Sequence, residues 1–223
     1  SAQSAGSNYS RQVNTLIGTK GVGLTSGYLY PGATYPYGMV QFTPSYFSKR
    51  SGFVINQLSG GGCEHMGNFP TFPVKGKLKM SPDNILNYRI NISEEKGHAG
   101  YYEAMVQEDI KAKLTVTERT GMASYEYPAD QQYGTVIIGG GISATPIEQA
   151  AIVITAPNKC EGYAEGGNFC GLRTPYKVYF VAEFDTDALE SGTWKRNELK
   201  PNTTFAEGEY SGVYFTFDVN KKK

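Results

Sequence analysis

The chain has 223 residues with 21 Lys plus Arg, 21 Asp plus Glu and two His, so it carries no net charge at pH 7. This balance excludes a protein that holds nucleic acid or an acidic membrane surface by electrostatic attraction. Its mean hydropathy is -0.40 and no apolar run approaches the roughly 20 residues of a membrane-spanning helix. The 27 Gly, 17 Tyr and 11 Phe favour strands and tight turns over disorder or a coiled coil.

In chain order, residues 10–17 predict a short helix of about two turns, which Gly18 ends. The rest of the first 70 residues is rich in Gly, Pro and Tyr and predicts long loops. Alternating apolar and polar residues then predict half-buried antiparallel strands, at residues 75–80, 87–92, 111–118 and 124–127. Three segments richer in β-branched and aromatic residues predict core strands covered on both faces, at residues 133–138, 150–155 and 176–184.

Turn residues separate these segments at the spacing of a meander or Greek-key sandwich. Strands do not alternate with ten-residue helical patterns, which disfavours a parallel βαβ sheet. No linker or repeat divides the chain. The sequence therefore predicts one all-β domain over residues 1–223, an antiparallel sandwich with few or short helices.

The three cysteines are Cys63, Cys160 and Cys170. The last two bracket a glycine-bearing segment able to fold back on itself, which makes a Cys160–Cys170 disulfide plausible. Such a bond would restrict the unfolded chain by roughly 2 to 3 kcal/mol and would persist in an oxidising compartment. The alternative is a pair of reduced, half-buried thiols. With two histidines and no Cys-x-x-Cys pair, we predict no metal site in this chain.

Residues 59–67 (SGGGCEHMG) place a thiol, a carboxylate and an imidazole directly after three glycines. Consecutive glycines expose backbone N–H groups. Neighbours along an extended chain point in opposite directions, however, so Cys63 and His65 do not by themselves make a nucleophilic pair. We interpret the segment as the wall of a small-molecule or sugar pocket and assign no catalytic residue in this chain.

Several motifs resemble one known family in order and spacing. They are VNTLIGT at residues 13–19, YPGATYPYGMVQFTP at residues 30–44, Gly52-Phe53 leading to LSGGGC at residues 58–63 with Gly67 beyond, and SGTWK at residues 191–195. Together they resemble the amino-terminal domain of glycoside hydrolase family 92, the calcium-dependent exo-acting α-mannosidases abundant in gut Bacteroidetes.

The resemblance implies a supersandwich of the galactose-mutarotase-like type. In the complete enzymes this domain packs on a carboxy-terminal (α/α)6 barrel that inverts the anomeric centre and holds the general acid, the base and the calcium ligands. The strand-like pattern of residues 214–220 reaches the end of the chain without a following turn, so we expect a cut inside a longer protein. The resemblance thus implies a secreted or periplasmic protein whose partners are its own catalytic domain and α-mannoside glycans. This chain alone is expected to need no cofactor and to be inactive.

In the family the amino-terminal domain closes one side of the sugar pocket, and we expect its Leu-Ser-Gly-x-Gly-Cys loop to lie nearest that interface. The resemblance thus points to substrate-binding roles for Gly60, Gly62 and Cys63, with Glu64 and His65 as neighbours. Many members carry a Trp-containing stretch and two histidines before this loop, whereas residues 47–57 here read FSKRSGFVINQ. The distal sugar would meet different groups, so no linkage preference is implied.

Two rival functions come from other classes. An autonomous carbohydrate-binding module would use Tyr and Phe side chains on a sheet or loop face and would bind mannosides without the rest of the protein. A complete enzyme of the mutarotase type is disfavoured, because that chemistry needs a paired imidazole and carboxylate and the chain has only two histidines.

Overall fold

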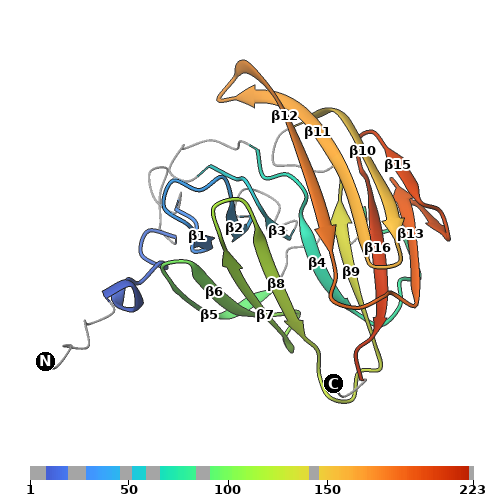
Figure 1. Ribbon diagram of the computed structural model, residues 1–223, viewed down its shortest axis with the longest axis horizontal. Coiled ribbons are helices and arrows are strands. Elements are labelled where there is room, and N and C mark those ends of the chain that lie inside the picture. The colour runs from blue at the N-terminus through green and yellow to red at the C-terminus, as the bar shows by residue number, and fades with distance from the viewer. Residues whose placement is uncertain are drawn as a thin grey trace, which may run out of the picture.

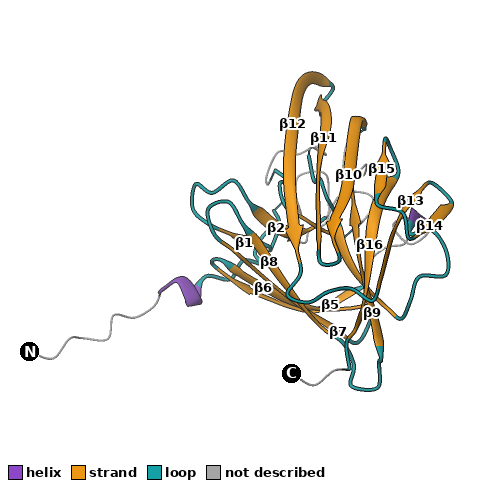
Figure 2. Cartoon of the chain, turned by 45° about the vertical axis from the view of Figure 1, so that its right-hand side comes forward, coloured by secondary structure: helices purple, strands orange, loops and turns teal. Residues whose placement is uncertain are grey.

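A computed structural model describes most of the chain. The described residues are 9–19, 29–45, 52–58, 66–83, 91–140 and 146–220. They contain a four-residue 3-10 helix, η1 (Tyr9–Gln12), followed by strands β1 to β16. Figure 2 shows that nearly all of the regular structure is strand, with helix confined to short pieces. No helix in these ranges is long and apolar enough to cross a membrane.

The strands form three antiparallel sheets (Figure 1). The large sheet has eight strands, in the order β1 (Ala33–Thr34), β2 (Gln41–Pro44), β3 (Phe53–Val54), β4 (Thr71–Lys75), β9 (Tyr133–Gly139), β16 (Ser211–Asp218), β13 (Glu190–Lys195) and β14 (Glu198–Pro201). The β5–β8 sheet is a meander of β5 (Ile92–His98), β6 (Tyr101–Val106), β7 (Ile110–Val116) and β8 (Gly121–Glu126). The β10–β12 sheet has the order β12 (Leu172–Glu183), β11 (Lys159–Phe169), β10 (Ile147–Ala156) and β15 (Phe205–Glu207).

The β5–β8 sheet packs on the β1–β4 half of the large sheet. Phe42 and Phe53 of the large sheet meet Tyr102 and Leu114 of the β5–β8 sheet in one buried cluster. The Phe42 and Phe53 rings pack edge to face with centroids 6.5 Å apart, an arrangement that aromatic quadrupoles favour. Alternation explains the contact, because every second residue of β6 and β7 is buried.

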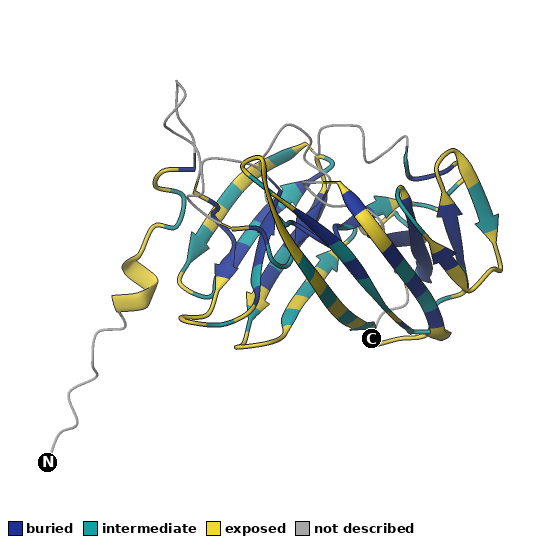
Figure 3. Ribbon diagram, turned by 90° about the horizontal axis from the view of Figure 1, so that it is seen from above, coloured by how far each residue is buried: buried dark blue, intermediate teal, exposed yellow. Residues whose placement is uncertain are grey.

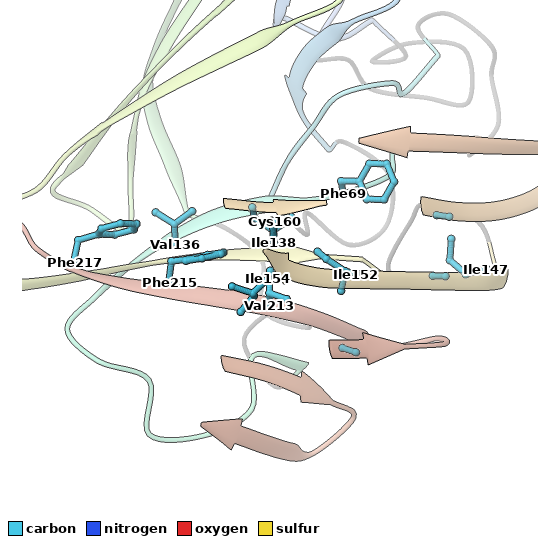
Figure 4. Close-up of a cluster of buried hydrophobic side chains, with 13 residues drawn as sticks. Phe69, Val136, Ile138, Ile147, Ile152, Ile154, Cys160, Val213, Phe215 and Phe217 are labelled. Carbon is cyan, nitrogen blue, oxygen red and sulfur yellow. The ribbon is translucent and has the colours of Figure 1, made fainter. Parts of the chain in front are cut away.

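The β10–β12 sheet packs on the other half of the large sheet. Register pairs Val136 of β9 with Phe215 of β16, so both side chains point to the same face. Figure 4 shows these side chains in one buried cluster with Ile152 of β10 and Cys160 of β11. Both cores thus lie between the large sheet and a four-stranded sheet, which makes a two-layer sandwich.

The opposite face of the large sheet carries a third, smaller cluster of Ile137, Tyr214 and Trp194. Leu78 and Leu199 pack against it. The centre of the large sheet is therefore covered on both faces, and β16 is buried along almost its whole length. This explains why β9 reads as a continuous apolar run instead of an alternating one. Figure 3 shows that buried residues gather in the strands at the interior of the molecule and that the turns are mostly exposed.

The all-β antiparallel sandwich with short helices is confirmed. Predicted strands are present at residues 111–118, 124–127, 133–138, 150–155 and 176–184, as β7, β8, β9, β10 and β12. Only the first of the three predicted core strands is covered on both faces. β12 is an edge strand of its sheet and alternates between exposed and half-buried residues along its second half.

Three other local predictions differ from the structure or lie outside it. Residues 75–80 are not a strand, because β4 ends at Lys75 and Gly76 adopts a left-handed φ of 77° that turns the chain away. The predicted two-turn helix at residues 10–17 is reduced to η1. Of the predicted strand at residues 87–92, positions 87–90 lie outside the described residues and Ile92 begins β5.

The segment after Cys160 does not fold back. It forms β11, an eleven-residue strand paired with both β10 and β12. Its glycines serve close packing: a Cβ at Gly162 would lie 2.3 Å from the Ala151 carbonyl oxygen. Gly in a strand interior marks such close backbone approaches as well as turns, and sequence alone does not separate the two uses.

Candidate functional site

The candidate site is built around the connection from β3 to β4, whose middle carries the predicted sugar-contacting residues. Its two ends are joined by a reciprocal pair of amides. The Asn68 backbone N–H donates to Asn56 Oδ1 at 2.7 Å, and Asn56 Nδ2 donates to Asn68 Oδ1 at 3.0 Å. The connection between these two residues therefore begins and ends at one place on the domain.

Strand β12 holds these ends from a distance of more than 100 positions in sequence. The Tyr176 hydroxyl donates to Asn68 Oδ1 at 3.1 Å. One residue further on, the rings of Phe69 and Phe180 lie with centroids 4.0 Å apart. Tyr176 and Phe180 belong to the half-buried, inward-facing set of β12. Polar and aromatic contacts thus join the β3–β4 connection to the β10–β12 sheet.

The backbone at the second end of the connection is held in an unfavourable conformation. Met66 and Phe69 have positive φ angles of 57° and 54°, and Gly67 between them has 76°. A left-handed conformation costs a non-glycine residue about 1 to 2 kcal/mol. Phe69 is 2% exposed and packs in the core, so burial of its ring offsets this cost.

Two buried amides beside this connection have unused hydrogen-bonding atoms. Gln57 is fully buried, and within the described ranges neither its Oε1 nor its Nε2 has a hydrogen-bond partner. Asn68 Nδ2 is also buried and has no hydrogen-bond partner within the described ranges. Leaving such a buried group unsatisfied costs about 1 to 3 kcal/mol. An amide offers both donors and an acceptor, which suits a water molecule or a ligand hydroxyl.

The predicted substrate-binding residues Gly60, Gly62, Cys63, Glu64 and His65 all lie outside the described residues. Their roles stay a prediction. The ends of the segment that carries them, residues 56–58 and 66–69, are the part of the site that the structure describes.

The predicted Cys160–Cys170 disulfide is wrong. Cys160 is a buried free thiol opposite Ala182 near the start of β11, whereas Cys170 lies in the turn after the last residue of β11. Nine or ten strand residues span about 30 Å, far beyond the roughly 6 Å between the Cα atoms of a disulfide. Cys170 is nevertheless disulfide-bonded. The alternative of two reduced thiols is therefore right for Cys160 alone.

The motif at residues 30–44 forms the hairpin of β1 and β2. Ala33 pairs with Phe42 in its register, and Tyr30, Ala33 and Phe42 are buried. Gly32 is required here, because a Cβ at this position would lie 2.2 Å from the Thr43 Cβ. Tyr35, Tyr37 and Met39, between the strands, are exposed. The second motif thus anchors a hairpin whose turn is aromatic and faces outward.

Sequence reasoning missed the residues that organise the described part of the site. Asn56, Gln57, Asn68 and Tyr176 carried no recognisable signal, because an amide has the same appearance in sequence whether it lies in a solvated turn or in a buried cluster. No group of three or more His, Cys, Asp or Glu in the described part of the chain is placed to hold a metal ion.

Comparison with known proteins shows the family to which the fold and the sequence motifs belong. Residues 12–223 match the Glycosyl hydrolase family 92 N-terminal domain. A protein of Arthroderma benhamiae described as an uncharacterized secreted glycosidase is 31% identical over 138 residues, which cover 53% of this chain and 17% of that protein.

Solved structures of family GH92 have the same fold. Two are from Bacteroides thetaiotaomicron: an alpha-mannosidase, with a TM-score of 0.76, 24% identity and 92% of this chain covered, and an inverting mannosidase, with a TM-score of 0.77, 24% identity and 95% covered. A further GH92 glycosyl hydrolase has a TM-score of 0.78 and 21% identity over 95% of this chain. The chain spans 29% to 31% of the length of these structures.

Proposed function

Since the chain belongs to the glycosyl hydrolase family 92 N-terminal domain family, we propose that it is the non-catalytic amino-terminal domain of a calcium-dependent, inverting exo-α-mannosidase. It packs on the catalytic barrel of the longer protein and lends residues 59–65 to one side of the sugar pocket. The observation that carries this proposal is the family match over residues 12–223, and the length of the similar structures supports a longer protein.

The described contacts suit a domain that presents a loop. Asn56, Asn68 and Tyr176 hold the two ends of the β3–β4 connection against the sandwich. The domain would therefore position its loop on a rigid support while the chemistry takes place on the barrel. Such support is valuable because small displacements of substrate-positioning groups reduce rates strongly.

Calcium and the general acid and base belong to the barrel in this proposal. The proposal therefore assigns no catalytic step to this chain. The name of the Arthroderma relative, a secreted glycosidase, supports a secreted protein, and the disulfide at Cys170 is compatible with an oxidising compartment.

The test is release of mannose from α-linked mannobioses with calcium present. It compares this chain with the protein extended through its downstream reading frame. We expect activity only in the extended protein, and chelation of calcium should abolish it. Activity of the 223-residue chain, or an extended protein that releases no mannose, would contradict the proposal.

A matched pair of amide variants tests the role of the β3–β4 connection. Asn56→Ala in the extended protein removes both hydrogen bonds to Asn68 and is expected to raise KM by about 10-fold, because the loop loses its support. Asn158→Ala removes a similar amide bond, from Asn158 Nδ2 to the Phe184 carbonyl, in the turn between β10 and β11. That control should leave KM unchanged, and equal effects would argue against a positioning role for Asn56.

A second candidate function is favoured by one face of the β10–β12 sheet. Tyr179, Val181 and Phe205 are 69%, 61% and 55% exposed there, and exposed aromatic rings can stack on the apolar faces of sugars. An autonomous carbohydrate-binding module would use this face. Calorimetric titration of the 223-residue chain with α-mannobioses tests it: binding that Tyr179→Ala abolishes would favour the module, and absence of binding would exclude it.

A further inference from the structure

The turn between β1 and β2 places a tyrosine where a glycine is usual. The Gly38 N–H donates to the Tyr35 carbonyl at 2.9 Å, which closes a four-residue turn over Pro36 and Tyr37. Tyr37 occupies the third position of this turn with a φ of +59°. Pro followed by a residue with positive φ is the pattern of a type II turn, in which Gly or Asn normally takes that position. The conformation of Tyr37 is therefore strained.

Nothing within the described structure compensates this strain. The Tyr37 side chain is fully exposed, at 105% of the reference area. Its neighbours Tyr35 and Met39 are also exposed, at 49% and 72%. Local strain persists in folded proteins where the surroundings enforce it, and it gathers at functional contacts. Here the chain keeps a bulky aromatic residue at a position that would suit a glycine, with its ring in solvent.

A second tyrosine provides an internal comparison. Tyr210 has nearly the same φ, +57°, but is only 40% exposed. The Arg196 guanidinium lies over its ring, 4.9 Å from the centroid, and the Arg196 N–H donates to the Tyr210 carbonyl at 2.8 Å. Cation–π and hydrogen-bond contacts thus offset the strain at Tyr210 inside the domain. Tyr37 has the same strain without such contacts in the part of the chain that the structure describes.

The turn that carries Tyr37 is held firmly. The Met39 N–H donates to the Glu118 carbonyl at 2.7 Å, which joins it to the β7–β8 turn. Phe42 of β2, the strand that follows this turn, is buried against the β5–β8 sheet. A rigidly mounted aromatic side chain loses little conformational entropy when it is buried in a partner, so it is suited to be an interface anchor.

We propose that Tyr37, flanked by Tyr35 and Met39, is an aromatic anchor that inserts into an apolar pocket of the carboxy-terminal part of the longer protein. This inference rests on the proposed function. The longer partner is favoured because the similar structures extend over about three times the length of this chain, which covers 29% to 31% of them. A sugar is the rival occupant, because exposed tyrosine rings also stack on sugars, but residues 35–39 carry no charged or amide side chain that would hydrogen-bond its hydroxyls.

Hydrogen exchange of the wild-type backbone is the first test. It compares the amides of residues 35–39 in the 223-residue chain and in the extended protein, with mannose release assayed on the same samples. We expect at least about 10-fold slower exchange in the extended protein, because the turn is buried there. Equal exchange in the two proteins overturns the inference. Slowing that requires added mannobiose, or that depends on protein concentration in the short chain, overturns it in favour of a sugar or a second copy.

A pair of variants gives a second, independent readout. Tyr37→Asn keeps a residue that tolerates positive φ but removes the ring, so the Tm of the 223-residue chain should stay the same or rise. The same change should lower the Tm of the extended protein, because the anchor is lost. Tyr210→Asn is the control and should lower the Tm of both proteins. A Tyr37→Asn effect that is the same in both proteins overturns the anchor.

The two hypotheses fail separately in these experiments. An extended protein that releases mannose while residues 35–39 exchange freely keeps the proposed function and overturns the anchor. An extended protein that releases no mannose contradicts the proposed function, and protection of residues 35–39 in it would still support the anchor.

Discussion

The two four-stranded sheets share one role and differ in what they show to the outside. Both are antiparallel, and both bury one face against the large sheet. On the inner face Leu114 of the β5–β8 sheet and Ile152 of the β10–β12 sheet are equivalent, at 0% and 1% exposure. The outer faces, by contrast, have different chemistry.

The outer face of the β5–β8 sheet is a network of charges. Glu103 lies within 3.7 Å of the Lys96 Nζ and 3.6 Å of the Lys111 Nζ, and it accepts a hydrogen bond from the Tyr101 hydroxyl at 2.7 Å. That hydrogen bond, helped by the two lysines, lowers the pKa of Glu103. Burial and the same hydrogen bond raise the pKa of Tyr101 to about 12. The polar groups of this face thus find partners on the sheet itself.

The outer face of the β10–β12 sheet carries aromatic and apolar side chains between two ion pairs, Lys177–Glu165 and Lys159–Glu183. Register places Tyr179 beside Tyr163 and Val153 beside Phe205 on neighbouring strands, and the two tyrosine rings lie 6.0 Å apart. Lys177 covers the Tyr163 ring at 4.1 Å. Tyr179 remains 69% exposed.

This difference shows that burial of the inner face does not determine the outer one. Ion pairs between exposed strands add little stability, and their main effect is to keep a sheet face solvated. An apolar outer face instead gains free energy when another surface covers it.

Truncating the inner face should have the largest effect. Leu114→Ala and Ile152→Ala are each expected to lower the free energy of unfolding by about 2 to 5 kcal/mol, because each leaves a cavity in a buried cluster. The matched outer-face variants Lys113→Ala and Tyr179→Ala should stay within about 0.5 kcal/mol of the wild type. Urea denaturation measures the free energy of unfolding of all four variants. An outer-face variant that loses as much stability as Leu114→Ala would contradict the difference between the two faces.

Alkaline pH should next destabilise the inner faces through their buried acids. Burial raises the pKa of the Cys160 thiol from 9.0 to about 12, and burial also raises the pKa of Tyr125, which packs against both cores. A raised folded-state pKa contributes stability that is present below the unfolded pKa and is lost as pH rises through the folded value.

The free energy of unfolding should therefore fall above pH 9. For Cys160 the loss is about 1.4 kcal/mol for each pH unit until about pH 12. Cys160→Ala should remove part of this slope, and a slope identical to that of the wild type would contradict a buried thiol. Reagents that modify thiolates should label Cys160 only after unfolding.

The charged outer face should give the smallest effect. Glu103→Gln keeps an acceptor for Tyr101 and removes the charge, so it should cost less than about 1 kcal/mol at neutral pH. The lowered pKa of Glu103 means that its contribution is present above pH 4.5 and is lost as pH falls through the folded value.

The control for this variant is Asp130→Asn, in the exposed turn between β8 and β9. Thermal unfolding between pH 3 and pH 7 compares the two. Glu103→Gln should flatten the acid limb of the stability curve and Asp130→Asn should not. An acid limb that both variants leave unchanged would show that the Glu103 network contributes nothing measurable.

The all-β class and several strands could be read from the sequence, because alternation of apolar and polar residues is a local property. Residues 111–118 and 124–127 are clear examples, since buried and half-buried residues alternate along most of β7, and half-buried and exposed residues alternate along β8. The family motif at residues 30–44 was also visible, and it forms the hairpin that carries Tyr37. These features could be predicted because they depend on residues that are close together in the sequence.

The arrangement of the site was decided by contacts between distant residues. Whether Gly162 turns the chain or packs against Ala151 depends on the strand beside it, and β11 instead of a closed loop separates Cys160 from Cys170. Asn68 meets Tyr176 across 108 positions. The local sequence pattern therefore determined which residues form strands. The distance between the cysteines, the buried amide cluster and the chemistry of the two outer faces were decided by which strands pair. The reason is that strand pairing brings together side chains that lie far apart in the sequence.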